Sequence, residues 1–255
     1  MVHKPKTFRY SGPGTCKRCQ NTPLCFQKAF TLIELLVVIA IIALLMAIMV
    51  PALDKAKRQA KATICFSNIR QIGLAANLYA DDNGQFIPRG TGSNVGPWFQ
   101  LFMSYLSQRP IGNNYRNVRI YRCPSYPNHH QTVCYVVNAW EFSSDADTVG
   151  HERGDPTKLS TCHNRGATIY LADNEDGPWR NIITGATDEG IRRCDVWNSS
   201  HLPTSRLEDE SFGRRIAHNR HKQGSNCLYL DWHVGHVKAD DMTGDMWRFH
   251  TGSRF

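Results

Sequence analysis

The sequence lacks the local signatures of the common enzyme and repeat architectures. It contains no internal repeat, no glycine-rich phosphate loop, and no serine elbow with histidine and aspartate at a recognisable spacing. Nothing in it therefore points to a solenoid, a P-loop NTPase or an α/β-hydrolase. Its 19 glycines and 12 prolines among 255 residues are ordinary, which excludes a collagen-like or wholly disordered chain.

Acidic residues are missing from the first 29 positions, and this absence explains most of the positive charge. Six of the 30 basic residues lie there, so the rest of the chain has 24 basic and 22 acidic residues. A nucleic-acid binder concentrates positive charge on a folded surface that neutralises phosphates. Here the charge adjoins a hydrophobic run, where lysine and arginine act as a topology signal. We therefore expect no nucleic-acid partner.

The cysteines lack the second Cys-X2-Cys pair that a four-cysteine zinc site needs. Cys16 and Cys19 have the spacing of half such a site, but free thiols in the basic segment are the simpler interpretation. Six more cysteines follow the hydrophobic run, at Cys65, Cys123, Cys134, Cys162, Cys194 and Cys227. In an exported region they permit disulfides. Cys123 and Cys134 are close enough in sequence to pair, and the connectivity of the six stays open.

Residues 30–50 form a long hydrophobic run in which polar side chains are almost absent. Only Thr31 and Glu34 among these 21 residues are polar. A helix of this length spans about 31 Å, close to the hydrocarbon core of a bilayer. A secretory signal peptide has a shorter apolar region followed by a cleavage site, whereas this run continues into Pro51 and a basic, helix-like stretch. A signal anchor that is never processed is the main alternative.

Glu34 distinguishes the run from a simple anchor. An acidic side chain in a membrane segment is costly and normally has a partner. Cleavage between Ala29 and Phe30 would give Phe30 a free α-amino group, one helical turn away from Glu34. When two such helices pack with a small axial stagger, the amine of one can neutralise Glu34 of its neighbour. The carboxylate would then serve assembly.

Residues 28–40, with the sequence KAFTLIELLVVIA, resemble the prepilin N-terminal cleavage and methylation motif of type IV pilins and type II secretion pseudopilins. The resemblance implies a single-pass protein of the bacterial inner membrane, with a cytoplasmic leader and a periplasmic or cell-surface head. A prepilin peptidase/methyltransferase would remove residues 1–29 and methylate Phe30. Other pilin-like subunits and the lipid bilayer would be the remaining partners. Pro51 matches the helix-bending proline of the family, whereas Ala29 stands where the family usually has glycine.

Beyond Pro51 the sequence predicts a continuing amphipathic helix, residues 51–82. Apolar residues recur at mostly three- and four-residue steps, at Leu53, Ala56, Ala60, Ile64, Ile69, Ile72, Ala76 and Tyr79. Asp81, Asp82 and Asn83, followed by Gly84, predict a helix end with a glycine cap. Their oxygens suit calcium, but no glutamate follows at the spacing of an EF-hand, so we interpret them as a solvated helix end.

Residues 83–255 are expected to form an α+β head, mainly antiparallel, with long loops. Together with a helix of about 50 residues, this gives the pilin-like lollipop that the resemblance implies. Three short runs have strand character, at Asn117–Cys123, Thr132–Val137 and Thr168–Ala172. Asp173, Glu175 and Asp176 precede Gly177-Pro178, and we interpret these acidic residues as an exposed turn rather than a cation site.

Residues 226–237 have the pattern of a β-hairpin around a two-residue connection, Asp231-Trp232. The spacing from His221 to Asp231 resembles the H-X9-DG signature of a group of prepilin-type, processing-associated bacterial proteins. Trp232 stands where that signature has glycine. A type I′ turn needs positive φ, which glycine adopts cheaply and tryptophan does not. We therefore expect another turn geometry.

His221, Asp231, His233 and His236, with His218 nearby, are weak candidates for metal ligands. Imidazoles and a carboxylate could hold zinc with an open position for water, which would support hydrolysis. Alternatively, His221 and Asp231 hydrogen-bond across the hairpin, while His233 and His236 point to opposite faces of a strand. Side chains on opposite faces cannot share one metal. We expect no metal, no cofactor and no catalytic residue.

The sequence as a whole predicts a structural, non-enzymatic pilin-like or pseudopilin-like subunit. Two alternatives stay open. One is a membrane-tethered extracytoplasmic hydrolase or binding protein that uses a prepilin-type anchor, and the other is the unprocessed signal-anchored protein.

Overall fold

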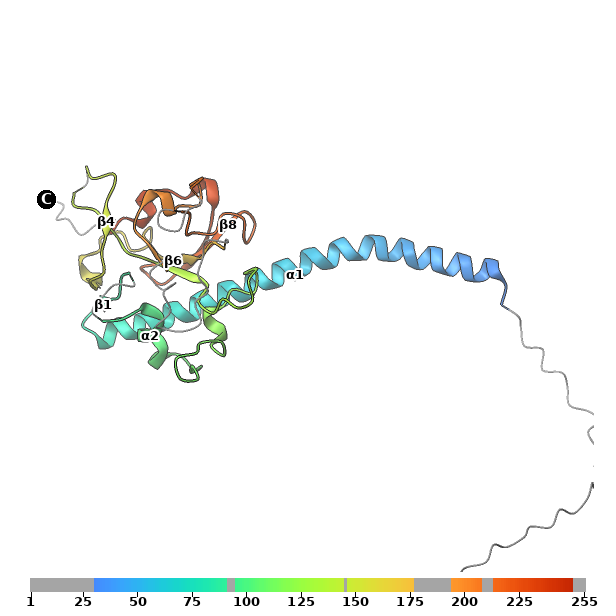
Figure 1. The fold of residues 1–255 in the computed structure, drawn as a ribbon, viewed down its shortest axis with the longest axis horizontal. Helices are drawn as coiled ribbons and strands as arrows, with labels where there is room; N and C mark the ends of the chain where they lie inside the picture. The colour runs from blue at the N-terminus through green and yellow to red at the C-terminus, as the bar shows by residue number, and fades with distance from the viewer. Residues whose placement is uncertain (1–29, 91–94, 145, 177–193, 208–212, 250–255) are drawn as a thin grey trace, which may run out of the picture. The chain divides into compact units, whose positions relative to one another are not determined.

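The computed structural model describes residues 30–90, 95–144, 146–176, 194–207 and 213–249 (Figure 1). By its internal contacts the chain divides into two units, residues 1–50 and residues 51–255. Helix α1 (Leu32–Asp82) contributes residues to both units. The head that the sequence predicts belongs to the second unit.

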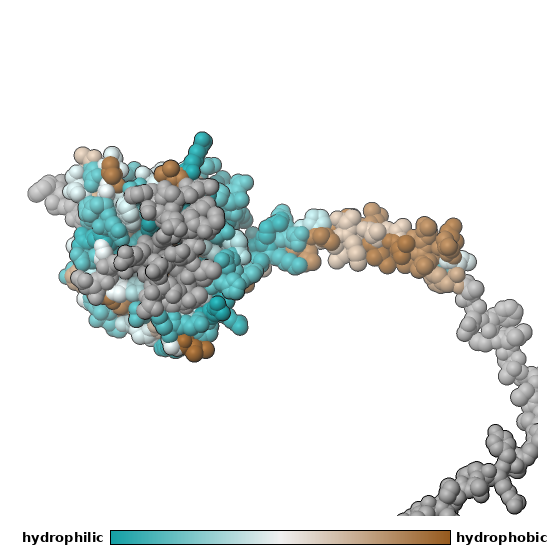
Figure 2. Space-filling view, in the orientation of Figure 1, coloured by the Kyte–Doolittle hydropathy of each residue, from teal (hydrophilic) through white to brown (hydrophobic). Residues whose placement is uncertain are grey.

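The described part of the first unit is the apolar start of α1, and its side chains are exposed on all sides. Figure 2 shows this part of the helix in the brown of hydrophobic residues, and Leu32 and Ile48 are 81% and 68% exposed. Among the described residues, α1 is the one helix whose length and composition suit a membrane span, and its most apolar window has no buried residue. A helix that is apolar all around needs an apolar environment outside its own domain. This fits a membrane anchor.

Helix α1 ends at a glycine cap, as its turn formers predict. The backbone N–H of Gln85 donates to the carbonyl of Ala80 at 2.7 Å, and Gly84 has φ of 64°. This six-to-one bond, with glycine in the left-handed region, is a Schellman motif. Asp81 and Asp82 accept side-chain hydrogen bonds from Gln85 and Tyr105 at the same end.

The second half of α1 buries one face of mostly small side chains. The buried residues recur at helical spacing, at Cys65, Asn68, Ile69, Ile72, Gly73, Ala75, Ala76 and Ala80. The predicted apolar stripe is therefore correct from Ile69 onward. Its first members, including Leu53 and Ile64, are about half exposed, at 54% and 50%. The sheet begins to cover the helix only near Cys65.

A five-stranded sheet forms the centre of the second unit, in the order β7-β2-β6-β8-β9. Neighbouring strands are antiparallel, except that β2 and β7 are parallel. The strands are β2 (Tyr135–Asn138), β6 (Ile169–Asp173), β7 (Asp195–Val196), β8 (Gly224–Tyr229) and β9 (Val234–Lys238). The mainly antiparallel α+β class that the sequence predicts is confirmed.

Two strand pairs and several short helices lie around this sheet. The pairs are β1 (Phe86–Ile87) with β5 (Thr157–Lys158), and β3 (Trp140–Glu141) with β4 (His151–Glu152). The short helices are α2 (Trp98–Leu101), η1 (Phe102–Tyr105), η2 (Arg119–Tyr121), η3 (Leu159–Thr161), η5 (Ser199–His201), η6 (Ala239–Asp241) and η7 (Gly244–Trp247).

The predicted strands have three different outcomes. Thr168–Ala172 is confirmed as β6, and the second half of Thr132–Val137 belongs to β2. The strand predicted at Asn117–Cys123 is wrong, because the 3-10 helix η2 occupies its centre. Ile120 and Tyr121 are buried there, and no strand among the described residues pairs with them. Apolar and aromatic character reports burial, and burial alone does not specify an extended backbone.

The sheet separates two hydrophobic clusters, because adjacent residues of a strand point to opposite faces. Val137, Leu171 and Leu228 lie in register on the face packed against α1. Their neighbours Val136, Ala172 and Cys227 face the other cluster, which includes Trp140 and Trp247. Apolar side chains therefore cover both faces of the sheet, which explains why every residue of β6 is buried.

Arg89 is a fully buried cation that lies against Asn138, the last residue of β2, and Trp140 in β3. Its guanidinium donates to the carbonyls of Asn138 and Trp140 and forms an ion pair of 2.7 Å with Glu141. It also lies 3.5 Å from the centroid of the Phe249 ring. Burial lowers the pKa of Arg89 to about 10, and Glu141 opposes that shift. Each buried donor therefore has a partner, as a buried charge requires.

We expect Arg89→Met to destabilise the protein by about 3–5 kcal/mol, because it leaves Glu141 and two carbonyls without their buried partner. The measurement is the denaturant midpoint of the detergent-solubilised protein. Arg116→Met, at an exposed arginine, should leave the midpoint unchanged. An equal loss in both variants would contradict the role assigned to Arg89.

Candidate functional site

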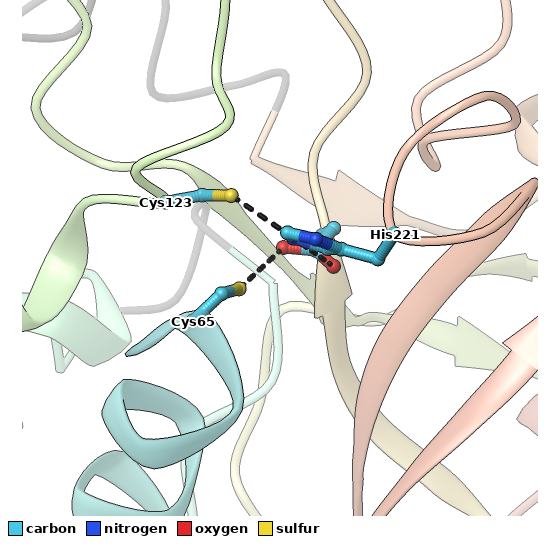
Figure 3. Close-up of side chains that lie close together, drawn as sticks. Cys65, Cys123 and His221 are labelled. Atoms are coloured by element: carbon cyan, nitrogen blue, oxygen red, sulfur yellow. Dashed lines mark hydrogen bonds and ion pairs between the residues drawn. The ribbon is translucent and has the colours of Figure 1, made fainter. Parts of the chain in front are cut away.

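Four side chains from separate segments of the second unit converge on one point. Cys65 comes from α1, Cys123 follows η2, Asp173 ends β6, and His221 precedes β8. One sulfur, nitrogen or oxygen atom from each lies within 4.8 Å of the corresponding atoms of the others. Figure 3 shows the labelled side chains of Cys65, Cys123 and His221 pointing toward one another. We call these residues the four-residue cluster.

The contacts inside the cluster are short and link all four side chains. The Cys65 thiol donates to Asp173 Oδ1 at 3.1 Å, and Cys123 Sγ lies 3.1 Å from His221 Nε2. The same Nε2 lies 3.6 Å from Asp173 Oδ2. The imidazole and the carboxylate are almost fully buried, with 2% and 0% of the side chains exposed.

Polar neighbours on α1 and the sheet hold two of these residues in place. Asn68, on the same face of α1 as Cys65, donates to the carbonyl of Arg122 at 2.9 Å and so fixes the backbone beside Cys123. Asp173 Oδ2 accepts the backbone N–H of Asn226 at 2.8 Å, which ties the end of β6 to β8. These bonds orient the Cys123 backbone and the Asp173 carboxylate before any ligand arrives.

His221 begins one turn of left-handed backbone. The φ angles of His221, Lys222 and Gln223 are 47°, 69° and 64°, and the turn closes with a 2.8 Å bond from the N–H of Gly224 to the carbonyl of Arg220. Each non-glycine residue costs about 1–2 kcal/mol in this region. Strain of this kind persists only where the surroundings fix it, and it is frequent at functional sites.

The protonation states of the cluster depend on one another. The hydrogen bond with Cys65, assisted by His221 and the charge of Arg220, lowers the pKa of Cys123 to about 4. Burial raises the pKa of Asp173 to about 6 and that of the Cys65 thiol well above its usual value. Burial opposes the charged form of His221, but Cys123 and Asp173 outweigh it and raise its pKa.

The donor set indicates what the cluster can do chemically. Two sulfurs, one imidazole nitrogen and one carboxylate facing a common centre are the ligands of thiophilic metals. A nucleophilic triad has another geometry, because its acid contacts the imidazole nitrogen remote from the nucleophile. Here Asp173 and Cys123 face the same Nε2 of His221.

A cavity of about 270 Å³ reaches the cluster at Cys123. Its lining combines apolar and polar side chains from α1 and the segment around η2: Ile64, Asn68, Arg119, Arg122, Cys123, Pro124, Tyr126, Asn128, His129 and Gln131. The cavity offers a route for a small ion or ligand to Cys123.

Among the pairings that the sequence left open, Cys123 with Cys134 is not formed. Both are free thiols, and Cys123 Sγ faces His221 Nε2 instead. Cys16 and Cys19 lie outside the described residues. The prediction of an exposed acidic turn is wrong. Asp173 and Glu175 do not form an exposed turn, since they are 0% and 4% exposed. The apolar run before Asp173, residues 169–172, was visible in the sequence, but nothing local marked the carboxylate itself as buried.

The histidine-rich candidates separate into different places. His221 joins the four-residue cluster, whereas Asp231 contacts His233 at 2.6 Å, with about half of each side chain exposed. His236 lies on β9, and His218 contacts Glu175 at 2.5 Å. The partners of His221 are thus Cys123 and Asp173, not Asp231.

The hairpin of β8 and β9 turns through three residues, not two. Tyr229 and His233 pair across the loop, and the N–H of Trp232 donates to the carbonyl of Tyr229 at 3.0 Å. Trp232 has φ of 72°, the left-handed position that follows a type I turn in three-residue hairpins. The geometry does differ from a type I′ turn, but Trp232 still takes positive φ. Its ring lies edge-on to Tyr170, with 6.1 Å between centroids.

The N-terminal residues of α1 form a capping box that was not anticipated. The backbone N–H and hydroxyl of Thr31 donate to Glu34 Oε2 at 2.9 and 2.8 Å, and the Thr31 hydroxyl accepts the N–H of Glu34 at 3.3 Å. A Thr-X-X-Glu pattern at a helix start is the signal for it. Phe30 is 71% exposed. Ala29 lies outside the described residues, and Pro51 lies inside α1.

Residues 25–50 match the model of the prokaryotic N-terminal methylation motif. The chain is also similar to the type II secretion system core protein G of Pseudomonas aeruginosa, with 33% identity over 87 residues, which covers 34% of this chain and 54% of that protein. It is 41% identical over 59 residues to the type IV wide pilus major component PilA4 of Thermus thermophilus, covering 23% of this chain and 45% of that protein.

These similarities support the prepilin-type motif and the likeness to pilins and pseudopilins. The chain spans about half the length of the curated relatives it matches. No solved structure matches the chain.

We expect Trp232→Gly to be more stable than Trp232→Ala by about 1 kcal/mol, because both lose the aromatic contact but only alanine keeps the left-handed strain. The comparison uses denaturant midpoints of the two detergent-solubilised variants. Equal midpoints, or a more stable alanine variant, would show that the backbone at Trp232 is not strained.

Proposed function

We propose that this chain is a pilin-like or pseudopilin-like structural subunit, processed by a prepilin peptidase and able to assemble into a type IV pilus or a type II secretion pseudopilus. The observation that carries the proposal is the methylation motif at residues 25–50, joined to a helix whose apolar start is exposed on all sides. Its similarity to a secretion core protein and a pilus component supports the same class.

In this proposal residues 1–29 are a cytoplasmic leader, and the peptidase cuts between Ala29 and Phe30 and methylates Phe30. Residues 30–50 cross the bacterial inner membrane once, residues 51–82 continue the helix, and residues 83–255 form a periplasmic or cell-surface head. The exposed apolar side chains of α1 supply the affinity for the bilayer, and later for neighbouring helices.

Glu34 changes partner during assembly. In the single chain its carboxylate caps α1 through Thr31. After cleavage, the α-amino group of Phe30 on a neighbouring subunit is a stronger partner, because it carries a full positive charge in an apolar environment. Pro51 lacks a backbone N–H, so α1 has a missing hydrogen bond where it leaves the membrane segment and can bend there.

The proposal is non-enzymatic, with no cofactor and no catalytic residue of its own. The proteins that act in it are the peptidase/methyltransferase and the neighbouring subunits. The membrane-tethered hydrolase, the alternative function, would need a site open to substrate and water.

The first test is mass spectrometry of the N-terminal peptide from membrane-extracted protein, expressed with a prepilin peptidase. We expect a peptide that begins at Phe30 and is heavier by one methyl group. Cells without the peptidase provide the control and should keep the leader. An intact leader in both samples would favour a signal anchor.

The second test separates the capping role of Glu34 from its charge. Glu34→Gln keeps a capping box, which accepts glutamine as well as glutamate, but removes the negative charge. We expect it to lower the assembled fraction, measured by shearing and sedimentation, by roughly tenfold. Thr31→Ala removes the cap, keeps the charge and should assemble nearly normally. Normal assembly of Glu34→Gln would refute the charge-pairing role.

A further inference from the structure

We propose that the four-residue cluster is a structural metal site that binds one thiophilic divalent cation, Zn²⁺ by preference. This inference goes beyond the pilin-like function and does not depend on it, because none of Cys65, Cys123, Asp173 and His221 lies in the leader. The metal would join α1, the segment after η2, and strands β6 and β8 through a single centre.

The distances between the donor atoms suit a tetrahedral zinc. Zinc bonds of about 2.0–2.3 Å place neighbouring ligand atoms about 3.3–3.8 Å apart. In the cluster, Cys65 Sγ to Asp173 Oδ1 and Cys123 Sγ to His221 Nε2 are both 3.1 Å, and His221 Nε2 to Asp173 Oδ2 is 3.6 Å. All four donor atoms lie within 4.8 Å of one another, so a central cation requires the wider pairs to contract toward that range.

The identity of the donors selects the ion. Thiolate sulfur and imidazole nitrogen favour zinc over magnesium and calcium, which prefer oxygen ligands in larger shells. Two thiolates and one carboxylate with Zn²⁺ leave one negative charge. Arg220, the residue before His221, is 6% exposed, and its guanidinium supplies a compensating positive charge.

Four protein ligands leave no open position, which characterises structural rather than catalytic zinc. The supporting shell is present as well. Asn226 donates its N–H to Asp173, and Asn68 holds the backbone beside Cys123. The strained left-handed turn at His221 delivers the imidazole to the centre, and metal coordination is an interaction that can offset such strain.

The test begins with metal analysis of the full detergent-solubilised chain, purified without added chelator. We expect one zinc per chain in the wild type and loss of zinc in Cys65→Ser/Cys123→Ser and in His221→Gln. Three controls should keep the zinc: Cys162→Ser, at a buried cysteine outside the cluster, Asp231→Asn in the hairpin, and Cys16→Ser/Cys19→Ser in the leader.

A second measurement does not depend on whether the variants fold. The wild-type chain is stripped with a chelator and titrated with Co²⁺. We expect one equivalent to give the intense visible bands of tetrahedral cobalt and the near-ultraviolet band of thiolate coordination, and excess Zn²⁺ to abolish both. We also expect metal removal to lower the Tm by about 10 °C or more, because metal binding is coupled to folding.

Three results of the metal measurements would overturn the proposal. These are the absence of the cobalt bands in the folded wild type, retention of zinc in the Cys65/Cys123 double variant, and loss of zinc only in the leader variant. A Cys65–Cys123 disulfide in the purified chain, found by thiol mapping before reduction, would also overturn it. An uncut leader would contradict the proposed function while leaving the zinc content unchanged, so the two can fail separately.

Discussion

The close packing of α1 against the sheet is the constraint on which the second unit depends. Gly73 makes it possible, because a Cβ at this position would lie only 2.7 Å from Leu228 Cδ1. Ala76 and Ala80, on the same buried face, extend this small-residue surface along the helix. Larger side chains would separate α1 from β8 and open the core between them. The same packing brings Cys65 within hydrogen-bonding distance of Asp173.

The buried charged groups of this core have different partners at two sites. Around Arg89, backbone carbonyls and Glu141 saturate the donors of one cation, so the arrangement is complete within the chain. In the four-residue cluster three acidic groups share a buried centre with His221, and their pKa values move in different directions: those of Cys65 and Asp173 are raised and that of Cys123 is lowered. Acidic groups so close together cannot all ionise without a compensating cation. The first arrangement is self-sufficient, whereas the second is suited to a ligand.

The two ends of α1 connect the proposed function to the core. At the start of the helix, Thr31 and Glu34 satisfy backbone donors of the first turn, and the proposed function has the same carboxylate pair with a neighbouring subunit. In the second half, Cys65 and Asn68 tie the helix to the sheet and to the segment around η2. For the subunit proposed here, contacts that keep the head attached to its helix are an advantage. The buried polar contacts of Cys65 and Asn68 contribute to that attachment.

The sequence by itself determined the features that depend on neighbours along the chain. The long apolar run, the glycine cap after Asp82 and the hairpin near His233 follow from local composition and periodicity. The prepilin-type motif around Glu34 follows from its resemblance to a known family. Only the tertiary structure decided which distant residues meet. Cys65 and Asp173 are 108 residues apart, and Cys123 and His221 are 98 apart, so no spacing rule joins them. The helix–sheet packing and the left-handed turn at His221 bring them together, because burial is a property of the assembled core and not of the local sequence.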